Sequence, residues 1–304
     1  MVKRFTEQDV PDQAGRTFLV TGANTGLGYE TARVLAERGA RVLLGCRSAE
    51  KAQAAIDQIL ADNPDADLAF VPLDQADLKS IERAADQVNA EPRLDVLVNN
   101  AGIMFPPLEY TQDGFESQFG VNHLGTFALT ALLLDKLWEQ EGARIISTSS
   151  IAHTFNARIY FNDIDARKSY NTARRYSQSK LANMLFMLEL DRRLESAGSA
   201  AISLACHPGI ADTELSRHMP ALVSRLMGPI NRRIFNTAAK GAWPTLAAAT
   251  SPLAERSGYY GPDGLGEYRG KAASARIHRN ALNEDVAARL WDLSIEMTGI
   301  DPGI

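Results

Sequence analysis

Two residues one helical turn apart, Tyr176 and Lys180, form the pattern in this sequence that is best suited to acid–base chemistry. They open an apolar helical segment, and a spacing of four residues places a phenol and an ammonium group on one face of that helix. A nearby cation stabilises the phenolate and lowers a pKa that is ordinarily about 10. The pair therefore predicts a tyrosine that serves as general acid or base.

Three further polar clusters follow predicted strands or open the helix after one. Asn99-Asn100-Ala101-Gly102 comes after the fourth predicted strand, Ser149 and Ser150 come after the fifth, and Asn122 opens a helix. The carboxyl ends of parallel strands meet at the edge where open α/β sheets bind their ligands. We therefore expect these clusters to converge with Tyr176 on one site.

A glycine-rich turn, TGANTGLG at residues 21–28, lies between the first predicted strand and the first predicted helix. In this setting Gly22 allows a tight turn, Gly26 lets the backbone approach a pyrophosphate, and Gly28 lets the helix pack closely on the sheet. The unpaired N–H groups at the start of the helix favour an anion. The turn predicts a dinucleotide cofactor; the alternative is a turn that serves packing alone.

The end of the second predicted strand indicates which dinucleotide is bound. An NAD-selective enzyme carries an acidic residue there for the ribose hydroxyls, but this chain has Cys46 followed by Arg47. A small neutral residue and a guanidinium suit a 2′-phosphate, which a carboxylate would repel. NADP(H) is therefore expected in preference to NAD(H); the alternative for Arg47 is a solvated cation at a helix start.

The elements that must position these residues follow from hydrophobic periodicity. Short apolar runs without alternation predict buried strands, and segments with helical periodicity separate them. The predicted strands are residues 17–20, 41–44, 68–73, 94–98, 144–148 and 201–206, and the predicted helices are residues 27–38, 49–60, 79–89, 122–140 and 174–196. This alternation predicts an α/β fold, a Rossmann-type doubly wound parallel β-sheet flanked by helices.

The domain count follows from the same alternation. The chain has 304 residues, and no linker or shift in composition interrupts the pattern. We therefore expect one domain over residues 1–304. Three segments depart from the rhythm: a polar lead at 1–15, an insert at 153–173, and a segment at about 211–235 that we expect to form a substrate lid.

Composition excludes several functional classes. The net charge is −5, which disfavours binding to nucleic acid, and two cysteines cannot form a disulfide framework or a thiolate metal site. His123, His153 and His207 show no close ligand spacing, so no metal is expected. The start of the chain lacks the apolar run of a secretory signal, and no stretch is long enough for a membrane span. We expect a cytoplasmic protein that acts on a small molecule.

Taken in order, these motifs resemble the short-chain dehydrogenase/reductase family. The resemblance runs from Gly15 to about Gly261 and rests on TGANTGLG, NNAG, Asn122, the serine pair, Tyr176-x-x-x-Lys180 and His207-Pro208-Gly209. VNHLGTF, SSIAH and YSQSKLAN resemble its retinol-dehydrogenase-like branch, which includes many soluble bacterial oxidoreductases. The resemblance implies a single Rossmann domain with a seven-stranded parallel sheet. It also implies a homodimer or homotetramer, formed through the helices at 122–140 and 174–196.

The resemblance also implies roles for individual residues. Tyr176 would give a proton to the carbonyl, and Ser150, in preference to Ser149, would orient the substrate oxygen. Lys180 would bind the nicotinamide ribose and lower the tyrosine pKa, and Asn122 would hold a relay water. The expected cofactor contacts are Gly22, Asn24, Thr25, Gly26, Leu27, Gly28, Arg47, Asp74, Gln75, Asn99, Ala101, Gly102, Tyr176, Lys180, Pro208, Gly209 and Thr213.

The expected activity is that of an NADPH-dependent carbonyl reductase, reversibly an alcohol dehydrogenase, acting on a hydrophobic aldehyde or ketone. Two alternatives stay open: reduction of a conjugated C=C bond, as in protochlorophyllide-reductase-like relatives, and a non-catalytic NADPH-binding sensor or scaffold.

Overall fold

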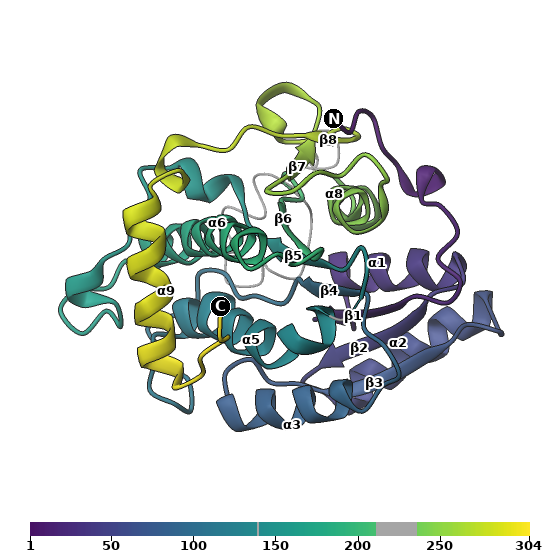
Figure 1. The fold of residues 1–304 in the computed structure, drawn as a ribbon, viewed down its shortest axis with the longest axis horizontal. Helices are drawn as coiled ribbons and strands as arrows, with labels where there is room; N and C mark the ends of the chain where they lie inside the picture. Colours follow the sequence, from purple (N-terminus) through teal and green to yellow (C-terminus); the bar gives the residue numbers. More distant parts are fainter. Residues whose placement is uncertain (139, 211–235) are drawn as a thin grey trace.

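Eight strands form a single sheet at the centre of the molecule (Figure 1). The computed structural model describes residues 1–138, 140–210 and 236–304. The strand order is β3-β2-β1-β4-β5-β6-β7-β8, with β1 to β7 parallel and β8 antiparallel to β7. The strands are β1 (Thr17–Thr21), β2 (Arg41–Cys46), β3 (Leu68–Pro72), β4 (Val96–Asn99), β5 (Arg144–Thr148), β6 (Ile202–Cys206), β7 (Tyr259–Pro262) and β8 (Ala272–Ser274).

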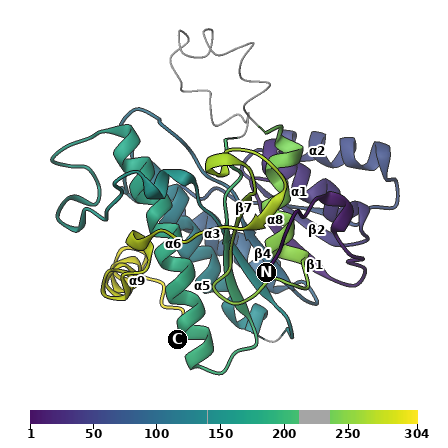
Figure 2. The ribbon, with the colours of Figure 1, turned by 90° about the horizontal axis from the view of Figure 1, so that it is seen from above.

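Two layers of helices cover the sheet. The helices are α1 (Gly26–Glu37), α2 (Ala49–Asp62), α3 (Leu78–Asn89), α4 (Ser117–Phe119), α5 (Gly125–Trp138), α6 (Thr172–Ser196), α8 (Ala238–Thr250) and α9 (Glu284–Thr298). Figure 2 shows α1, α2 and α8 on one side of the strands and α5, α6 and α9 on the other. Helix α9 lies outside α6, and its Trp291 packs against Phe127 of α5 and Phe186 of α6.

The burial of the central strands explains their sequence pattern. In β2, Val42 and Leu44 join the apolar cluster under α1, α2 and α8, whereas Leu43 joins the cluster under α3 and α5. Successive side chains of a strand point to opposite faces, so a strand covered on both faces is apolar at every position. The sequence pattern therefore predicted the doubly wound sheet correctly.

The sheet differs from the prediction at the edge formed by β7 and β8. The seven parallel strands are present, but β7 and the antiparallel β8 lie in a segment where periodicity predicted no strand. Both strands are short, and β7 ends in Gly261-Pro262. Such strands lack the length and periodicity that identify an element from sequence.

Residues 1–15 are also more than a polar lead. Val2, Phe5 and Val10 are almost fully buried, and Phe5 pairs with Ala272 of β8 in a β-bridge. The N-terminus accordingly lies beside β8 in Figure 1. These three apolar residues, isolated among polar ones, pack against an edge of the sheet that sequence reasoning had not placed. The expected lid at 211–235 lies outside the described residues.

Candidate active site

The glycine-rich turn has the geometry of an anion cradle. Gly22 and Gly26 adopt the left-handed region, with φ of 66° and 57°. A Cβ on Gly28 would lie 2.3 Å from the Gly22 carbonyl oxygen, so helix α1 approaches the turn as closely as a glycine permits. Thr25, the residue before α1, makes no side-chain cap, so the first N–H groups of the helix stay available to an anion.

Asn100 fixes the position of this turn relative to β4. Its side-chain amide donates to the Thr21 carbonyl at 2.8 Å, and the backbone N–H groups of Asn100 and Ala101 donate to the Thr21 hydroxyl. Asn99, which the sequence predicts as a cofactor contact, donates its amide to Thr130 of α5 and is 2% exposed; its contact with the cofactor stays a prediction. Asn100, the second asparagine of the NNAG motif, therefore holds the glycine-rich turn in place, a role that the sequence did not indicate.

The end of β2 presents one thiol and one cation. Cys46 is buried, and desolvation raises the pKa of its thiol to about 11, so the side chain is neutral. Arg47 is exposed and makes no hydrogen bond or ion pair with the described part of the chain. Asp74 and Gln75 follow the neighbouring β3; Asp74 accepts from the Ala76 N–H, and Gln75 donates to Thr126 at 3.4 Å.

Tyr176 and Lys180 lie on the first turns of α6. Both are nearly buried, with exposures of 6% and 5%, and the Lys180 Nζ lies 5.7 Å from the centre of the Tyr176 ring. Nζ donates to the Thr148 carbonyl at the end of β5, at 3.1 Å. The helix thus places both side chains at the carboxyl edge of the sheet, as the spacing predicted.

Burial dominates the protonation of this pair. Desolvation raises the pKa of Tyr176 to about 12 against the lowering influence of the Ser150 hydroxyl. Desolvation lowers the pKa of Lys180 to about 8. The Lys180 ammonium donates to the Thr148 carbonyl, and the lowering of the tyrosine pKa by this lysine stays a prediction.

The two serines after β5 have different environments. Ser149 is 2% exposed and donates its hydroxyl to the Lys180 carbonyl at 2.9 Å, so this group is committed to the backbone of α6. Ser150 caps a 3₁₀ turn (Ile151–Thr154) and is the serine whose hydroxyl lowers the pKa of Tyr176. His153 holds Ser150 in place, because its Nδ1 lies 2.6 Å from the Ser150 carbonyl oxygen. The geometry thus favours Ser150 over Ser149 as the site residue.

Asn122 lies in a single π-helical turn (Gly120–Leu124) between α4 and α5. Its side chain accepts from the Ile103 N–H at 2.8 Å and donates to the Ile103 carbonyl and to Ser179 at 3.0 Å each. A Cβ on Gly102 would lie 3.0 Å from the Asn122 Oδ1 and 3.5 Å from the Lys180 Nζ. Gly102, Asn122 and Lys180 therefore meet, although they come from three separate elements.

The loop after β6 is held by His207. The Gly209 N–H donates to Nδ1 of His207 at 3.2 Å, so the ring proton is on Nε2, which lies 2.9 Å from a Glu267 carboxylate oxygen. Gly209 is left-handed, with φ of 73°. Pro208 and Gly209 follow the carboxyl end of β6, while Thr213 lies outside the described residues. His123 points elsewhere, toward Ser294 of α9 at 2.9 Å.

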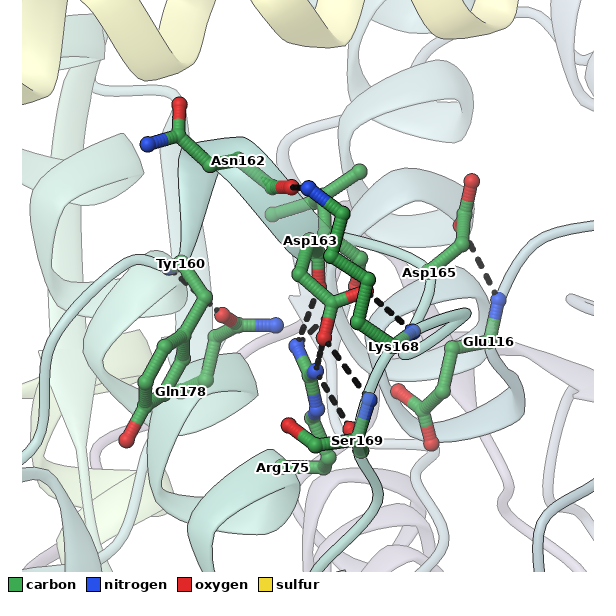
Figure 3. Close-up of polar contacts among 10 residues, drawn as sticks. Glu116, Tyr160, Asn162, Asp163, Asp165, Lys168, Ser169, Arg175 and Gln178 are labelled. Atoms are coloured by element: carbon green, nitrogen blue, oxygen red, sulfur yellow. Dashed lines mark hydrogen bonds and ion pairs between the residues drawn. The ribbon is translucent and has the colours of Figure 1, made fainter.

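The insert at 153–173 is tied to α6 by the side chains of Arg175 and Gln178 (Figure 3). Arg175 is 3% exposed and donates to the Asp163 carboxylate at 2.7 Å, to the Asp163 carbonyl at 2.6 Å and to the Ser169 carbonyl at 2.8 Å. Gln178 accepts from the Tyr160 N–H at 2.8 Å. Residues 175 and 178 share one face of α6 and residues 176 and 180 another, so the helix holds the insert on one side and the site on the other.

Comparison with known proteins adds independent evidence. A sequence model of the family described as "short chain dehydrogenase" matches residues 16–221. Human retinol dehydrogenase 13 is 44% identical over 294 residues, covering 94% of this chain and 86% of its own length, and mouse retinol dehydrogenase 12 is 41% identical over 290 residues, covering 94% and 87%.

Solved structures agree with these sequence relatives. The crystal structure of an uncharacterised protein from Mycobacterium paratuberculosis is 40% identical, with a TM-score of 0.82 over 99% of this chain and 100% of that one. The NADP complex of RhlG from Pseudomonas aeruginosa is 25% identical, with a TM-score of 0.65 over 82% and 94%. Among the helices that the structure describes, none combines the length and apolar character that a membrane span requires.

Proposed function

This chain belongs to the short-chain dehydrogenase/reductase family, as an NAD(P)-dependent oxidoreductase of alcohols and carbonyls in the retinol-dehydrogenase-like branch, and on that premise we propose that it is an NADPH-dependent carbonyl reductase. Its substrate is a hydrophobic aldehyde or ketone, and the reverse reaction oxidises the corresponding alcohol. The observation that carries the proposal is the meeting of Ser150, Tyr176 and Lys180 beside Asn122 at the carboxyl edge of the sheet.

The residues present fit a dinucleotide. Gly22, Gly26 and the uncapped start of α1 would hold the pyrophosphate, and Arg47 would pair with a 2′-phosphate beside the neutral Cys46. Lys180 and the loop at Pro208 and Gly209 would hold the nicotinamide end. When bound, the cofactor supplies the hydride that reduces the carbonyl carbon.

The side chains supply position and a proton. Tyr176 donates its phenolic proton to the carbonyl oxygen as negative charge develops there, and Ser150 donates a hydrogen bond to the same oxygen. A tyrosine whose pKa is raised to about 12 is protonated at neutral pH, which is the form that reduction requires. Lys180 binds the nicotinamide ribose, and Asn122 holds the water through which the phenol regains a proton.

The decisive experiment is Tyr176→Phe, tested with a panel of aldehydes and ketones and read by NADPH absorbance. We expect turnover to fall by about 10³-fold or more, because the proton donor is lost, while NADPH still binds. Tyr259→Phe is the matched control: Tyr259 is 3% exposed, and its hydroxyl has no partner among the described residues. Near-normal turnover of Tyr176→Phe would contradict the proposal.

The same panel separates the alternatives. Product analysis with an enone distinguishes reduction of the carbonyl from reduction of the conjugated C=C bond. Tight NADPH binding without turnover of any carbonyl would favour a sensor or scaffold.

Cellular location and assembly complete the proposal. Cys46 and Cys206 are both free thiols, which suits the reducing cytoplasm. A homodimer or homotetramer stays a prediction. Because α9 covers part of the outer side of α5 and α6, we expect any subunit contact to include α9.

A further inference from the structure

Phe105 has an unusual backbone conformation close to the catalytic centre. It follows the NNAG motif, precedes Pro106, and has φ of 58°, in the left-handed region. A bulky aromatic residue rarely adopts this region, and such strain persists only where the surroundings impose it. Residues strained in this way cluster at functional sites, so the contacts of Phe105 indicate what the strain achieves.

Gln118 of α4 fixes the backbone of Phe105. Its side chain is fully buried; Oε1 accepts from the Phe105 N–H at 3.0 Å, and Nε2 donates to the Thr172 carbonyl at 3.1 Å. The next carbonyl, that of Pro106, accepts from the Tyr170 hydroxyl at 2.7 Å and from the Thr172 hydroxyl at 3.0 Å. The loop is thus fastened to residues 170–172, which lead into α6.

The strained loop places the ring of Phe105 on Tyr176. The two rings meet edge to face, with centroids 5.2 Å apart and planes at 71°. Phe105 is half-buried, whereas Tyr176 is 6% exposed. A carbonyl compound that accepts the proton of Tyr176 therefore binds close to this ring.

We propose that Phe105 is a specificity-determining residue that contacts the apolar part of the substrate beside Tyr176, and that Gln118 is the positioning residue that holds it there. This inference rests on the proposed carbonyl reduction and identifies Phe105 as a residue that lines the substrate site. The insert contributes Tyr170 and Thr172, whose hydroxyls hold the Pro106 carbonyl.

The first test compares decanal with propanal as substrates of the full-length protein. In Phe105→Ala we expect kcat/KM for decanal to fall about tenfold, mainly through KM, and kcat/KM for propanal to change less than about threefold. Phe105→Leu, which keeps apolar bulk, should give a smaller loss. Without the ring, water reaches Tyr176, so the high-pH limb of kcat/KM should move to lower pH.

The second test is a double-mutant cycle. Gln118→Leu removes the side-chain hydrogen bonds to Phe105, Tyr170 and Thr172 at similar volume, and we expect it to reduce the decanal-to-propanal ratio of kcat/KM even though Phe105 is intact. In the Phe105→Ala background it should leave that ratio unchanged, because Gln118 acts through the ring. If Gln118 had a merely structural role, Gln118→Leu would lower kcat/KM for decanal and for propanal equally in either background.

Three results would overturn the inference. Phe105→Ala with the selectivity and pH profile of the wild type would remove the role of the ring, and additive effects in the cycle would remove that of Gln118. Wild-type protein that binds NADPH but reduces neither aldehyde would overturn the proposed function and this inference together. The first two results leave the proposed function intact.

Discussion

The left-handed residues differ between the two halves of the molecule. In the cofactor half, residues 17–102, each one is a glycine: Gly22, Gly26 and Gly39. In the substrate half, residues 103–282, the left-handed positions also include Phe105, Asn156, Ala166, Ser257 and Glu267. Glycine adopts this region without steric penalty, whereas other residues must be held in it by their neighbours. The cofactor half therefore encodes its turns in residue type, and the substrate half imposes them through tertiary contacts.

The largest effect that tests this comparison is expected in the cofactor half. Gly28→Ala would place a methyl group 2.3 Å from the Gly22 carbonyl oxygen and 2.6 Å from the Asn100 amide nitrogen. We expect the free energy of unfolding to fall by about 1–3 kcal/mol and NADPH affinity to fall roughly a hundredfold, because α1 must move away from the turn. Urea unfolding and a fluorescence titration measure the two effects.

Gly142→Ala is the matched control. Gly142 is left-handed, with φ of 74°, but a Cβ there meets nothing within 4 Å. Backbone strain alone should lower the free energy of unfolding by about 1 kcal/mol and leave NADPH affinity unchanged. Equal NADPH affinities in the two variants would show that the contact at Gly28 does not shape the cradle.

In the substrate half, the corresponding change is the loss of a tertiary anchor. Arg175→Met leaves the Asp163 carboxylate and the Ser169 carbonyl without their buried donor, so we expect Tm to fall by several degrees. Arg174→Met, one residue earlier and exposed, is the control and should leave Tm unchanged. Calorimetry measures both Tm values. Equal Tm values for the two variants would contradict the role of tertiary contacts in the substrate half.

Acid sensitivity should also belong to the substrate half, since all five histidines lie at or beyond residue 123. Burial lowers the pKa of His123 to about 3. Between about pH 6.5 and 3 the unfolded chain gains a proton at this residue that the folded chain does not. The free energy of unfolding should therefore decrease as the pH is lowered from about 6.5 to 3, by up to about 1.4 kcal/mol per pH unit.

His123→Gln removes this titration and retains a partner for Ser294. We expect its unfolding free energy, measured by urea titration at several pH values, to vary less between pH 6.5 and 4 than that of the wild type. An unchanged slope would assign the acid sensitivity to other groups.

The smallest expected effect concerns a single exposed charge in the cofactor half. Arg47→Asp should reduce the preference for NADPH over NADH about tenfold, because a 2′-phosphate loses its cation and meets a carboxylate. Lys136→Asp, which makes the same change of charge at the far end of α5, should leave the preference unchanged. The ratio of kcat/KM values for the two cofactors measures it, and an unaltered ratio in Arg47→Asp would favour the solvated-cation alternative.

The contrast between the halves also describes what the sequence could predict. The strand at 144–148 was predicted with its observed bounds, and Tyr176 and Lys180 were placed by spacing, because apolar runs and helical periodicity are local signals. Phe105 and Gln118 carry no such signal, since their roles depend on contacts with residues 170–172 and with Tyr176. The burial that raises the pKa of Tyr176 has no local signal either, because the extent of burial is a property of the folded molecule.

The pairing of Phe5 with Ala272 has a consequence for synthesis of the chain on the ribosome. Val2, Phe5 and Val10 are synthesised more than 250 residues before β8, the strand that Phe5 joins. At a synthesis rate of about 5–20 residues per second, roughly ten to fifty seconds pass between the synthesis of these side chains and that of β8. During that interval they are exposed apolar groups, available to nascent-chain chaperones and to other chains. Closing this edge of the sheet is therefore among the last events of folding.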